Sequence, residues 1–393
     1  MNRDNISALL TGIAVVALIV GFAVYFNNPA LNKVSSAQNA GKGFVSTVTV
    51  DSATGKITKA QYSIDKSQFT KAPDFADVSG YINTNPITLK DLKGKVVLVD
   101  FWTYSCINCI RTLPYLVDWN AKYADKGLVI VGVHTPEFDF EKNIDNVKAA
   151  VQKFGIKYPV LQDNDKGTWN AYENRYWPHK YLVDGDGYIR YDHIGEGGYA
   201  ETEKIIQTLL AERAAQQGAK TLNFNTSGLA NPSNVQSIDF SKVNSPELYF
   251  GYQFARDPLG SPEGFHPEQL VNYSIPSSDL KPNLVYLQGV WKNNADNLEL
   301  AGNTGKIILV YSAKSINIVA GGSGQAQISE DGIKSGSHTS GNSTGGSDIN
   351  NSGQFNIDGQ RLYNIANHPD YGNHYIVLDV KGKGFQAYTF TFG

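Results

Sequence analysis

The chain contains little sulphur: its 393 residues include only two cysteines and one methionine. Two cysteines cannot form a disulfide framework or a four-cysteine zinc site. Charged residues make up 18% of the chain, the formal net charge is −3, and no basic block occurs, so nothing in the composition points to nucleic-acid binding. Hydrophobic residues make up 41%, which is enough for packed cores and excludes a chain that is disordered throughout.

The two cysteines, Cys106 and Cys109, lie three positions apart at the junction of two predicted elements. An apolar stretch typical of a buried strand, residues 95–101, precedes them, and a helical stretch, residues 110–123, follows. This order places both thiols in the first turn of a helix, where unpaired backbone N–H groups and the helix dipole stabilise a thiolate. The second thiol is close enough to resolve a mixed disulfide formed by the first. The pair is therefore predicted to be a dithiol/disulfide exchange site.

A structural disulfide and half of a zinc site are the alternatives for this pair. A bridge that closes so short a loop adds little chain-entropy stabilisation. A zinc site needs four ligands, and the few histidines are scattered, with no obvious partner for the cysteines. We therefore predict no metal ligands and no bound cofactor, the redox group being the Cys106–Cys109 disulfide itself.

An uncharged, mostly apolar run near the N-terminus, residues 6–26, is long enough to span a bilayer. Arg3 before it and Lys33 after it favour a cytoplasmic N-terminus, with the bulk of the chain outside the cell membrane. A cleaved signal peptide is the alternative, although the run is longer than a typical signal core. Residues 1–40 are thus predicted to be a single-pass anchor and tether. The scarcity of cysteine and methionine suits an oxidising, extracytoplasmic compartment.

Two domains are predicted after this anchor. In residues 41–217, a β-hairpin extension at 44–64 precedes strands and helices in βαβ order, which indicates a mixed sheet flanked by helices. In residues 218–393, helical periodicity fades and short apolar strands recur, which predicts an all-β sandwich of jelly-roll type. The fold class is therefore α/β followed by all-β. The short strands expected in the second domain are 284–288, 307–311, 316–319, 325–328, 361–365, 374–380 and 386–392.

Six runs in the first domain form a specific pattern: residues 94–109 (GKVVLVDFWTYSCINC), 111–115 (RTLPY), 132–138 (GVHTPEF), 168–172 (TWNAY), 176–178 (YWP) and 195–199 (GEGGY). On these runs, residues 72–203 resemble the thioredoxin-like domain of the TlpA and ResA type, and most closely the version found in DipZ-type proteins of cytochrome c biogenesis and thiol–disulfide interchange. Residues 247–393 resemble, more loosely, the extra C-terminal domain of those proteins. The resemblance implies a thioredoxin-like enzyme, a thiol–disulfide oxidoreductase.

The resemblance also implies roles for the residues of the cysteine motif. Cys106 matches the exposed nucleophile, which attacks a substrate disulfide, and Cys109 matches the resolving thiol. Ile107 and Asn108 lie between them and are expected to tune the couple.

Further roles follow for residues near the motif in the family. Asp100 matches a buried acid behind the cysteines; a carboxylate in an apolar strand has a raised pKa and can exchange a proton with Cys109. A strand-end residue bonded to the backbone is the alternative. Pro178 matches the cis-proline of the family, and the backbone before it, at Trp177, faces the disulfide and pairs with a substrate chain. Trp102 is expected beside the motif or in the core.

The implied function is that of a membrane-anchored, extracytoplasmic reductase for disulfides of exported proteins. DipZ-type proteins carry a CcdA-like membrane domain, and here one apolar run stands in its place, so a separate CcdA-like electron donor is expected. Three alternatives stay open: a DsbA-type oxidase or isomerase, a peroxiredoxin-like antioxidant enzyme, and a cell-surface module with an inactive redox domain that binds glycans or proteins. Trp291 either stacks on a glycan or fills the sandwich core. Glu137 either lies near the thiols or is a plain loop carboxylate.

Overall fold

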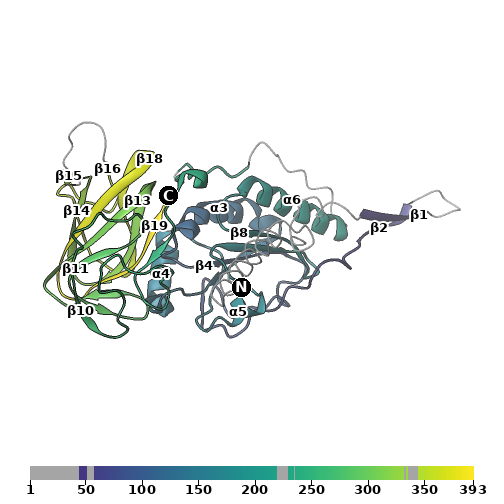
Figure 1. The fold of residues 1–393 in the computed structure, drawn as a ribbon. Coiled ribbons are helices and arrows are strands. Elements are labelled where there is room, and N and C mark those ends of the chain that lie inside the picture. The colour runs from purple at the N-terminus through teal and green to yellow at the C-terminus, as the bar shows by residue number, and fades with distance from the viewer. Residues whose placement is uncertain (1–43, 51–56, 219–228, 234, 332, 335–343) are drawn as a thin grey trace, which may run out of the picture.

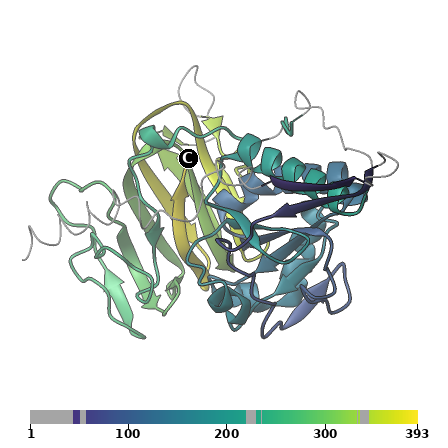
Figure 2. The ribbon, with the colours of Figure 1, turned by 90° about the vertical axis from the view of Figure 1, so that its right-hand side faces the viewer.

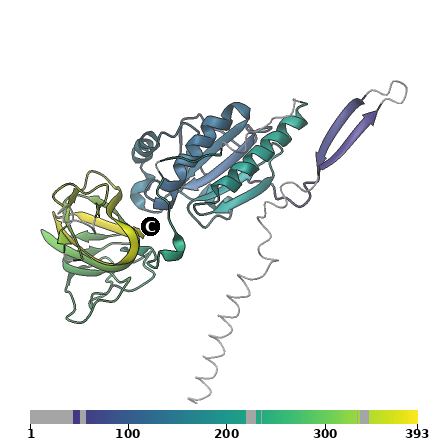
Figure 3. The ribbon, with the colours of Figure 1, turned by 90° about the horizontal axis from the view of Figure 1, so that it is seen from above.

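The structure is a computed structural model that describes residues 44–50, 57–218, 229–233, 235–331, 333–334 and 344–393. An α/β domain and an all-β domain lie side by side, and the hairpin of β1 (Phe44–Val50) and β2 (Ile57–Ile64) projects from the α/β domain on the side away from the β domain (Figure 1, Figure 3). The predicted membrane span, residues 6–26, lies outside the described residues. Among the helices that are described, none has the length and apolar character needed to cross a bilayer.

The α/β domain is built on a six-stranded sheet with the order β3-β6-β5-β4-β7-β8. The predicted mixed sheet is confirmed, whereas its edge strand β3 was not predicted. The central strand β4 runs parallel to β5 and antiparallel to β7. All seven residues of β4 are buried, which explains its nearly continuous apolar sequence. The strands are β3 (Gly80–Ile82), β4 (Val96–Trp102), β5 (Leu128–His134), β6 (Val160–Gln162), β7 (His179–Val183) and β8 (Ile189–Ile194).

Helices cover both faces of this sheet: α3 (Ile107–Tyr123), α4 (Ile144–Lys153), α5 (Gly167–Ala171) and α6 (Tyr199–Gln216). Side chains of α3, α4 and α6 form the apolar core on one face, and α5 packs on the other. Figure 2 shows α6 beside the β1–β2 hairpin. Helix α3 begins three residues before the predicted start, because Cys106 is its N-cap. Pro114 lies inside α3 and has no N–H, so the helix lacks one backbone hydrogen bond there.

The β domain is one continuous network of strands with the order β10-β11-β12-β19-β13-β18-β14-β15. Its central strand β13 pairs with β18 along nearly its whole length, with β11 near its start and with β19 near its end. Two long, bent strands thus fold the network over a single apolar core. The strands are β9 (Leu248–Tyr249), β10 (Leu270–Tyr273), β11 (Tyr286–Asn293), β12 (Leu298–Leu300), β13 (Thr304–Gly322), β14 (Gln325–Glu330), β15 (Ile333–Lys334), β16 (Thr344–Gly345), β17 (Gln354–Asn356), β18 (Arg361–Lys381) and β19 (Phe385–Phe392).

The all-β prediction is confirmed, but four of the predicted short strands are halves of two long ones. Ranges 307–311 and 316–319 both belong to β13, and ranges 361–365 and 374–380 both belong to β18. Polar residues at the bends interrupt the apolar pattern and split each strand in the sequence. Trp291 is completely buried in the core of this domain, so the prediction that it stacks on a glycan is wrong.

The two domains meet at a cluster of rings that we call the aromatic junction: Phe138, Phe140, Tyr249, Phe254 and Tyr388. Phe138 and Phe140 follow β5, and their ring centroids lie 5.2 and 4.8 Å from that of Tyr388 in β19. Tyr249 and Phe254 place their centroids 6.4 and 6.0 Å from Phe138. Rings at these separations pack as in a protein core, so the β domain is docked on the α/β domain through apolar contact.

Candidate active site

The cysteine pair lies where β4 ends and α3 begins. Cys106 is half-buried and Cys109 is buried, both are free thiols, and their Sγ atoms are 2.7 Å apart. The backbone N–H of Cys109 donates to Cys106 Sγ at 3.2 Å, which stabilises negative charge on that sulphur. Burial raises the pKa of the Cys109 thiol well above its ordinary value. The geometry therefore suits attack by the accessible sulphur first and by the buried sulphur second.

A buried acid and a buried amine lie behind the cysteines. Asp100 in β4 and Lys180 in β7 stand directly opposite each other in the sheet, with 1% and 0% of their surface exposed. Burial raises the pKa of Asp100 to about 7, although the charge of Lys180 opposes the shift, and burial lowers the pKa of Lys180. Both groups interact electrostatically with Cys109. Asp100 can therefore take up or release a proton near neutral pH beside the buried thiol.

Lys180 is a residue that the sequence analysis missed. Its amine donates a hydrogen bond to the carbonyl of Gly195 at 2.8 Å, while Asp100 Oδ1 accepts none from the described residues. The signal in the sequence is a lysine two residues after Pro178, at the start of a short strand that continues with Tyr181, Leu182 and Val183. Lys180 lies opposite Asp100 only because β4 and β7 pair antiparallel in this register. The sequence of either strand by itself does not predict that pairing.

The peptide bond between Trp177 and Pro178 is cis, as predicted. In the pairing of β4 with β7, His179 stands opposite Phe101, so the proline lies at the end of the sheet from which the cysteine turn departs. The indole N–H of Trp177 donates to the carbonyl of Thr135 at 3.0 Å and fixes the loop before the proline. The structure thus brings this loop and the cysteine turn to the same edge of the sheet.

The remaining residues near the motif differ in their surroundings. Asn108 Oδ1 accepts a hydrogen bond from Arg111 Nη2 at 2.7 Å, and Arg111 forms an ion pair with Glu196 at 2.8 Å. Ile107 is half-buried at the start of α3. Trp102 is 1% exposed and belongs to the core under α3, so of its two predicted locations the structure shows the core. Asn108 is therefore tied to an ion pair that joins the start of α3 to the segment between β8 and α6.

Comparison with known proteins identifies the domain that carries this site. A model of the AhpC/TSA family matches residues 70–192. Thiol-disulfide oxidoreductase ResA of Bacillus thuringiensis (strain Al Hakam) is 35% identical over 148 residues, which cover 37% of this chain and 80% of ResA. Thiol-disulfide oxidoreductase YkuV of Bacillus subtilis (strain 168) is 30% identical over 141 residues, 36% of this chain and 94% of YkuV. The chain belongs to the thioredoxin-like thiol–disulfide oxidoreductases.

The similarity extends to the second domain of this oxidoreductase. A model described as the thioredoxin like C-terminal domain matches residues 245–393. Protein DipZ of Mycobacterium bovis (strain ATCC BAA-935 / AF2122/97) is 40% identical over 266 residues, which cover 66% of this chain and 36% of DipZ. The resemblance to DipZ-type proteins is therefore confirmed, and the chain spans about a third of the length of that relative.

Glu137 of the oxidoreductase lies at the aromatic junction. Its Oε1 accepts a hydrogen bond from the hydroxyl of Tyr249 at 2.7 Å, and burial, together with the nearby Glu247, raises its pKa to about 8. Glu141, which the sequence analysis missed, accepts from Ser105 Oγ at 2.5 Å and from the backbone N–H of Glu137 at 2.7 Å. The carboxylate of Glu137 thus bonds to the β domain, whereas Glu141 links the backbone of Glu137 to Ser105, the residue before the first cysteine.

Tyr104 brings the β domain next to the cysteine turn. Its hydroxyl donates to the backbone carbonyl of Gln360 at 3.3 Å, and its ring stacks on His134 with centroids 5.7 Å apart. Burial lowers the pKa of His134 to about 3, so this ring is neutral at physiological pH. Gln360 also donates to the hydroxyl of Tyr388 at 3.2 Å. A residue two positions before Cys106 is therefore held by the β domain.

Proposed function

We propose that this oxidoreductase reduces disulfide bonds of exported proteins, and that residues 6–26 anchor it in the membrane with its two domains outside the cytoplasm. The observation that carries the proposal is the placement of a half-buried Cys106 before a buried Cys109, with Asp100 behind them. No cofactor is needed besides the Cys106–Cys109 couple.

The proposed reaction has two exchange steps. Cys106 Sγ attacks one sulphur of the substrate disulfide, the S–S bond breaks, and the other substrate sulphur leaves as a thiolate that takes up a proton. Cys109 then loses its proton to the Asp100 carboxylate and attacks Cys106 Sγ. The Cys106–Cys109 disulfide forms, the S–S bond of the mixed disulfide breaks, and the second substrate sulphur leaves as a thiolate that takes up a proton. Two electrons pass from the enzyme to the substrate. A carboxyl with a pKa of about 7 suits this proton transfer at neutral pH.

We propose that the substrate chain lies between the Pro178 loop and the β domain. The backbone at Trp177 supplies main-chain contacts on one side, since this loop shares an edge of the sheet with the cysteines. The contact between Tyr104 and Gln360 marks the other side. The β domain then forms one side of the substrate site and favours substrate segments that fit between it and the Pro178 loop.

The exported location and the redox partner complete the proposal. A low content of cysteine and methionine suits an oxidising compartment, and the similarity to DipZ covers both domains. We infer that a CcdA-like membrane protein returns electrons to the Cys106–Cys109 disulfide after each turnover.

Insulin reduction by the full chain in detergent tests the chemistry. Cys106→Ser should abolish turnover, because the attacking sulphur is lost, and Cys109→Ser should trap mixed disulfides with the substrate. Turnover by the Cys106→Ser variant would refute the assignment.

The reduction potential of the couple tests the direction. Equilibration against glutathione should give about −250 mV or lower, as for thioredoxin-type reductants. A potential near about −120 mV would contradict a reductase and assign an oxidase of the DsbA kind.

A further inference from the structure

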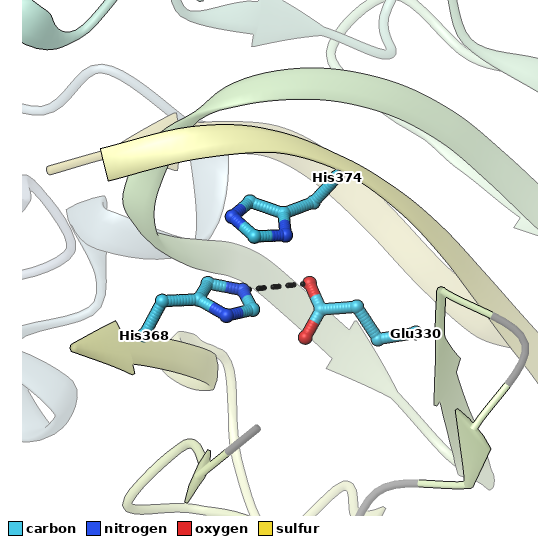
Figure 4. Close-up of side chains that lie close together, drawn as sticks. All are labelled: Glu330, His368 and His374. Carbon is cyan, nitrogen blue, oxygen red and sulfur yellow. Dashed lines mark ion pairs between the residues drawn. The ribbon is translucent and has the colours of Figure 1, made fainter. Parts of the chain in front are cut away.

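The β domain contains a second cluster of chemically active side chains, remote in sequence from the cysteines. Figure 4 shows Glu330, at the end of β14, facing His368 and His374, both from β18. Each residue offers one ligand atom, and these atoms all lie within 4.8 Å of one another. Glu330 and His368 are buried, with side chains 2% and 3% exposed, and Glu330 Oε1 lies 3.1 Å from His368 Nε2.

An irregularity in β18 brings the two histidines together. The pairing with β13 passes from Asn367 directly to Gly372, which leaves residues 368–371 outside the ladder. Extra residues in one strand bend it and redirect its side chains. As a result, the rings of His368 and His374 stack with centroids 3.5 Å apart and planes inclined by 5°.

Two consecutive carboxylates face this pair of rings. Asp331 follows Glu330 and has φ at +49°, so the chain turns sharply after β14. Asp331 Oδ2 lies 3.0 Å from His374 Nδ1, and its Oδ1 accepts the backbone N–H of Tyr375 at 2.9 Å. Each imidazole therefore has its own carboxylate, and Asp331 is fixed to β18 by the backbone.

The hydrogen bonds of this cluster are incomplete. Glu330 Oε2 is buried and has no partner among the described residues. Buried polar atoms are rarely left without a partner, and a bound ion is one of the standard explanations. The hydroxyl of Tyr311 donates to Glu330 Oε1, which fixes the orientation of that carboxylate as groups behind a metal ligand do.

We propose that Glu330, His368 and His374, with Asp331 as the fourth ligand, bind one divalent transition-metal ion, and that zinc is its first candidate. Two imidazole nitrogens and two carboxylate oxygens suit zinc in its usual tetrahedral geometry. Bonds of about 2.0–2.2 Å place neighbouring ligand atoms about 3.4 Å apart. To bind one ion, the two stacked rings turn out of their parallel arrangement so that both ring nitrogens point at it. With both carboxylates ionised and both rings neutral, a divalent ion balances the charge. The ion would fasten the turn after β14 to the irregular part of β18.

Zinc titration of the full chain in detergent tests the proposal. Reduced cysteines also bind zinc, so the test uses the Cys106→Ser/Cys109→Ser protein after metal is removed with a chelator. One equivalent of Zn²⁺ should bind and raise the melting temperature. Cobalt in its place should give the intense visible bands of a tetrahedral site. Since the cysteines are absent, the result is independent of the proposed redox function.

Matched variants locate the ion. His368→Ala and His374→Ala should each weaken zinc binding at least about 100-fold, a larger effect than loss of one outer contact. His266→Ala is the control, since His266 is exposed in the same domain, lies outside this cluster, and its ring bonds to the backbone carbonyl of Glu263. Glu330→Gln and Asp331→Asn preserve side-chain volume and give the same test if the alanine variants do not fold. The proposal is overturned if the folded Cys106→Ser/Cys109→Ser protein binds no zinc, or if binding is unchanged in all four variants. The cluster is then a hydrogen-bonded network without a metal ion.

Discussion

Each domain buries a cluster of ionisable side chains, and the two clusters balance their charges differently. In the α/β domain, one acid, Asp100, faces one amine, Lys180, and a proton can leave the acid for the neighbouring thiol or return to it. In the β domain, two carboxylates face two imidazoles, and the hydrogen bonds and ion pairs of Glu330 with the described residues include no amine. A balanced pair suits proton transfer, whereas an excess of carboxylates suits a cation.

The clusters also differ in their access to water. Asp100 and Lys180 are 1% and 0% exposed, so any change in their charge is coupled to the neighbouring sulphur. The side chains of His374 and Asp331 are 14% and 51% exposed, so an ion can reach the second cluster from solvent. The comparison predicts that pH changes act on the first cluster and metal ions on the second.

The largest expected effect is on the pH dependence of stability in Asp100→Asn. Burial raises the pKa of Asp100 from its ordinary value of 3.8 to about 7. Between these values the folded chain binds the extra proton, so the free energy of unfolding falls as pH rises from about 4 to about 7, by roughly 4 kcal/mol in total. The amide of the variant cannot bind such a proton. Urea unfolding from pH 4 to pH 8 should therefore give a flatter profile for Asp100→Asn than for the parent protein.

Asp165→Asn is the matched control for that experiment, since it removes an exposed carboxyl from the same domain, and it should leave the slope between pH 4 and pH 7 unchanged. Equal slopes for Asp100→Asn and the parent protein would show that Asp100 does not hold the proton.

The next effect is on turnover. Asp100→Asn should slow insulin reduction at pH 7 by about 100-fold, the lower range for loss of a general acid–base group. The mixed disulfide on Cys106 should persist longer, because the step that slows is deprotonation of Cys109. Quenched-flow trapping of the mixed disulfide measures this step directly.

Lys180→Met sharpens this second prediction, because the charge of Lys180 lowers the pKa of Asp100. The inflection of the pH–rate profile should move to higher pH in that variant. Unchanged turnover in Asp100→Asn would make the acid a structural residue, the alternative considered from the sequence.

A smaller effect is expected in the second cluster. In metal-free protein, Glu330→Gln should lower the free energy of unfolding by about 1–3 kcal/mol, because the buried ring of His368 loses its charged partner. Insulin reduction should not change, since no contact joins this cluster to the cysteines among the described residues. A parallel loss of turnover would show that the two clusters are coupled.

The smallest effect is expected where the domains meet. Tyr249→Phe removes the hydrogen bond to Glu137 and should lower stability by about 1 kcal/mol. Because that bond lowers the pKa of Glu137, the pKa of this carboxyl should rise above about 8 in the variant. Urea unfolding and the ¹³C chemical shift of the Glu137 carboxyl measure the two changes. A lowered pKa would contradict the observed contact.

The sequence predicted the α/β domain well because its signals are local. The buried strand β4 is a continuous apolar run, the cysteines are contiguous with it, and the order of elements allows few arrangements. Cys106 and Cys109 could therefore be placed from neighbouring residues, whereas Asp100 and the cis bond before Pro178 were placed by the resemblance to the family.

What the sequence missed depends on contacts between distant segments. Lys180 becomes part of the site only because β7 pairs with β4, and Glu141 only because its side chain reaches back to Ser105. The cluster of Glu330 and its histidines arises from an irregular strand pairing and has no motif spacing. Polar residues at the bends also concealed that β13 and β18 are single strands.

The two domains differ in how local their contacts are. Helix α3 of the α/β domain forms from neighbouring residues, whereas the pairing of β13 with β18 joins residues as far apart as Thr304 and Lys381 and must close that loop first. The α/β domain is also synthesised first, so we expect it to fold first, while Phe138 and Phe140 still face water. During synthesis the chain thus forms the Cys106–Cys109 site before the β domain has folded beside it. At that stage the α/β side of the aromatic junction is an exposed apolar surface that can associate with other chains. Pulsed hydrogen exchange during refolding should show α3 protected before β18.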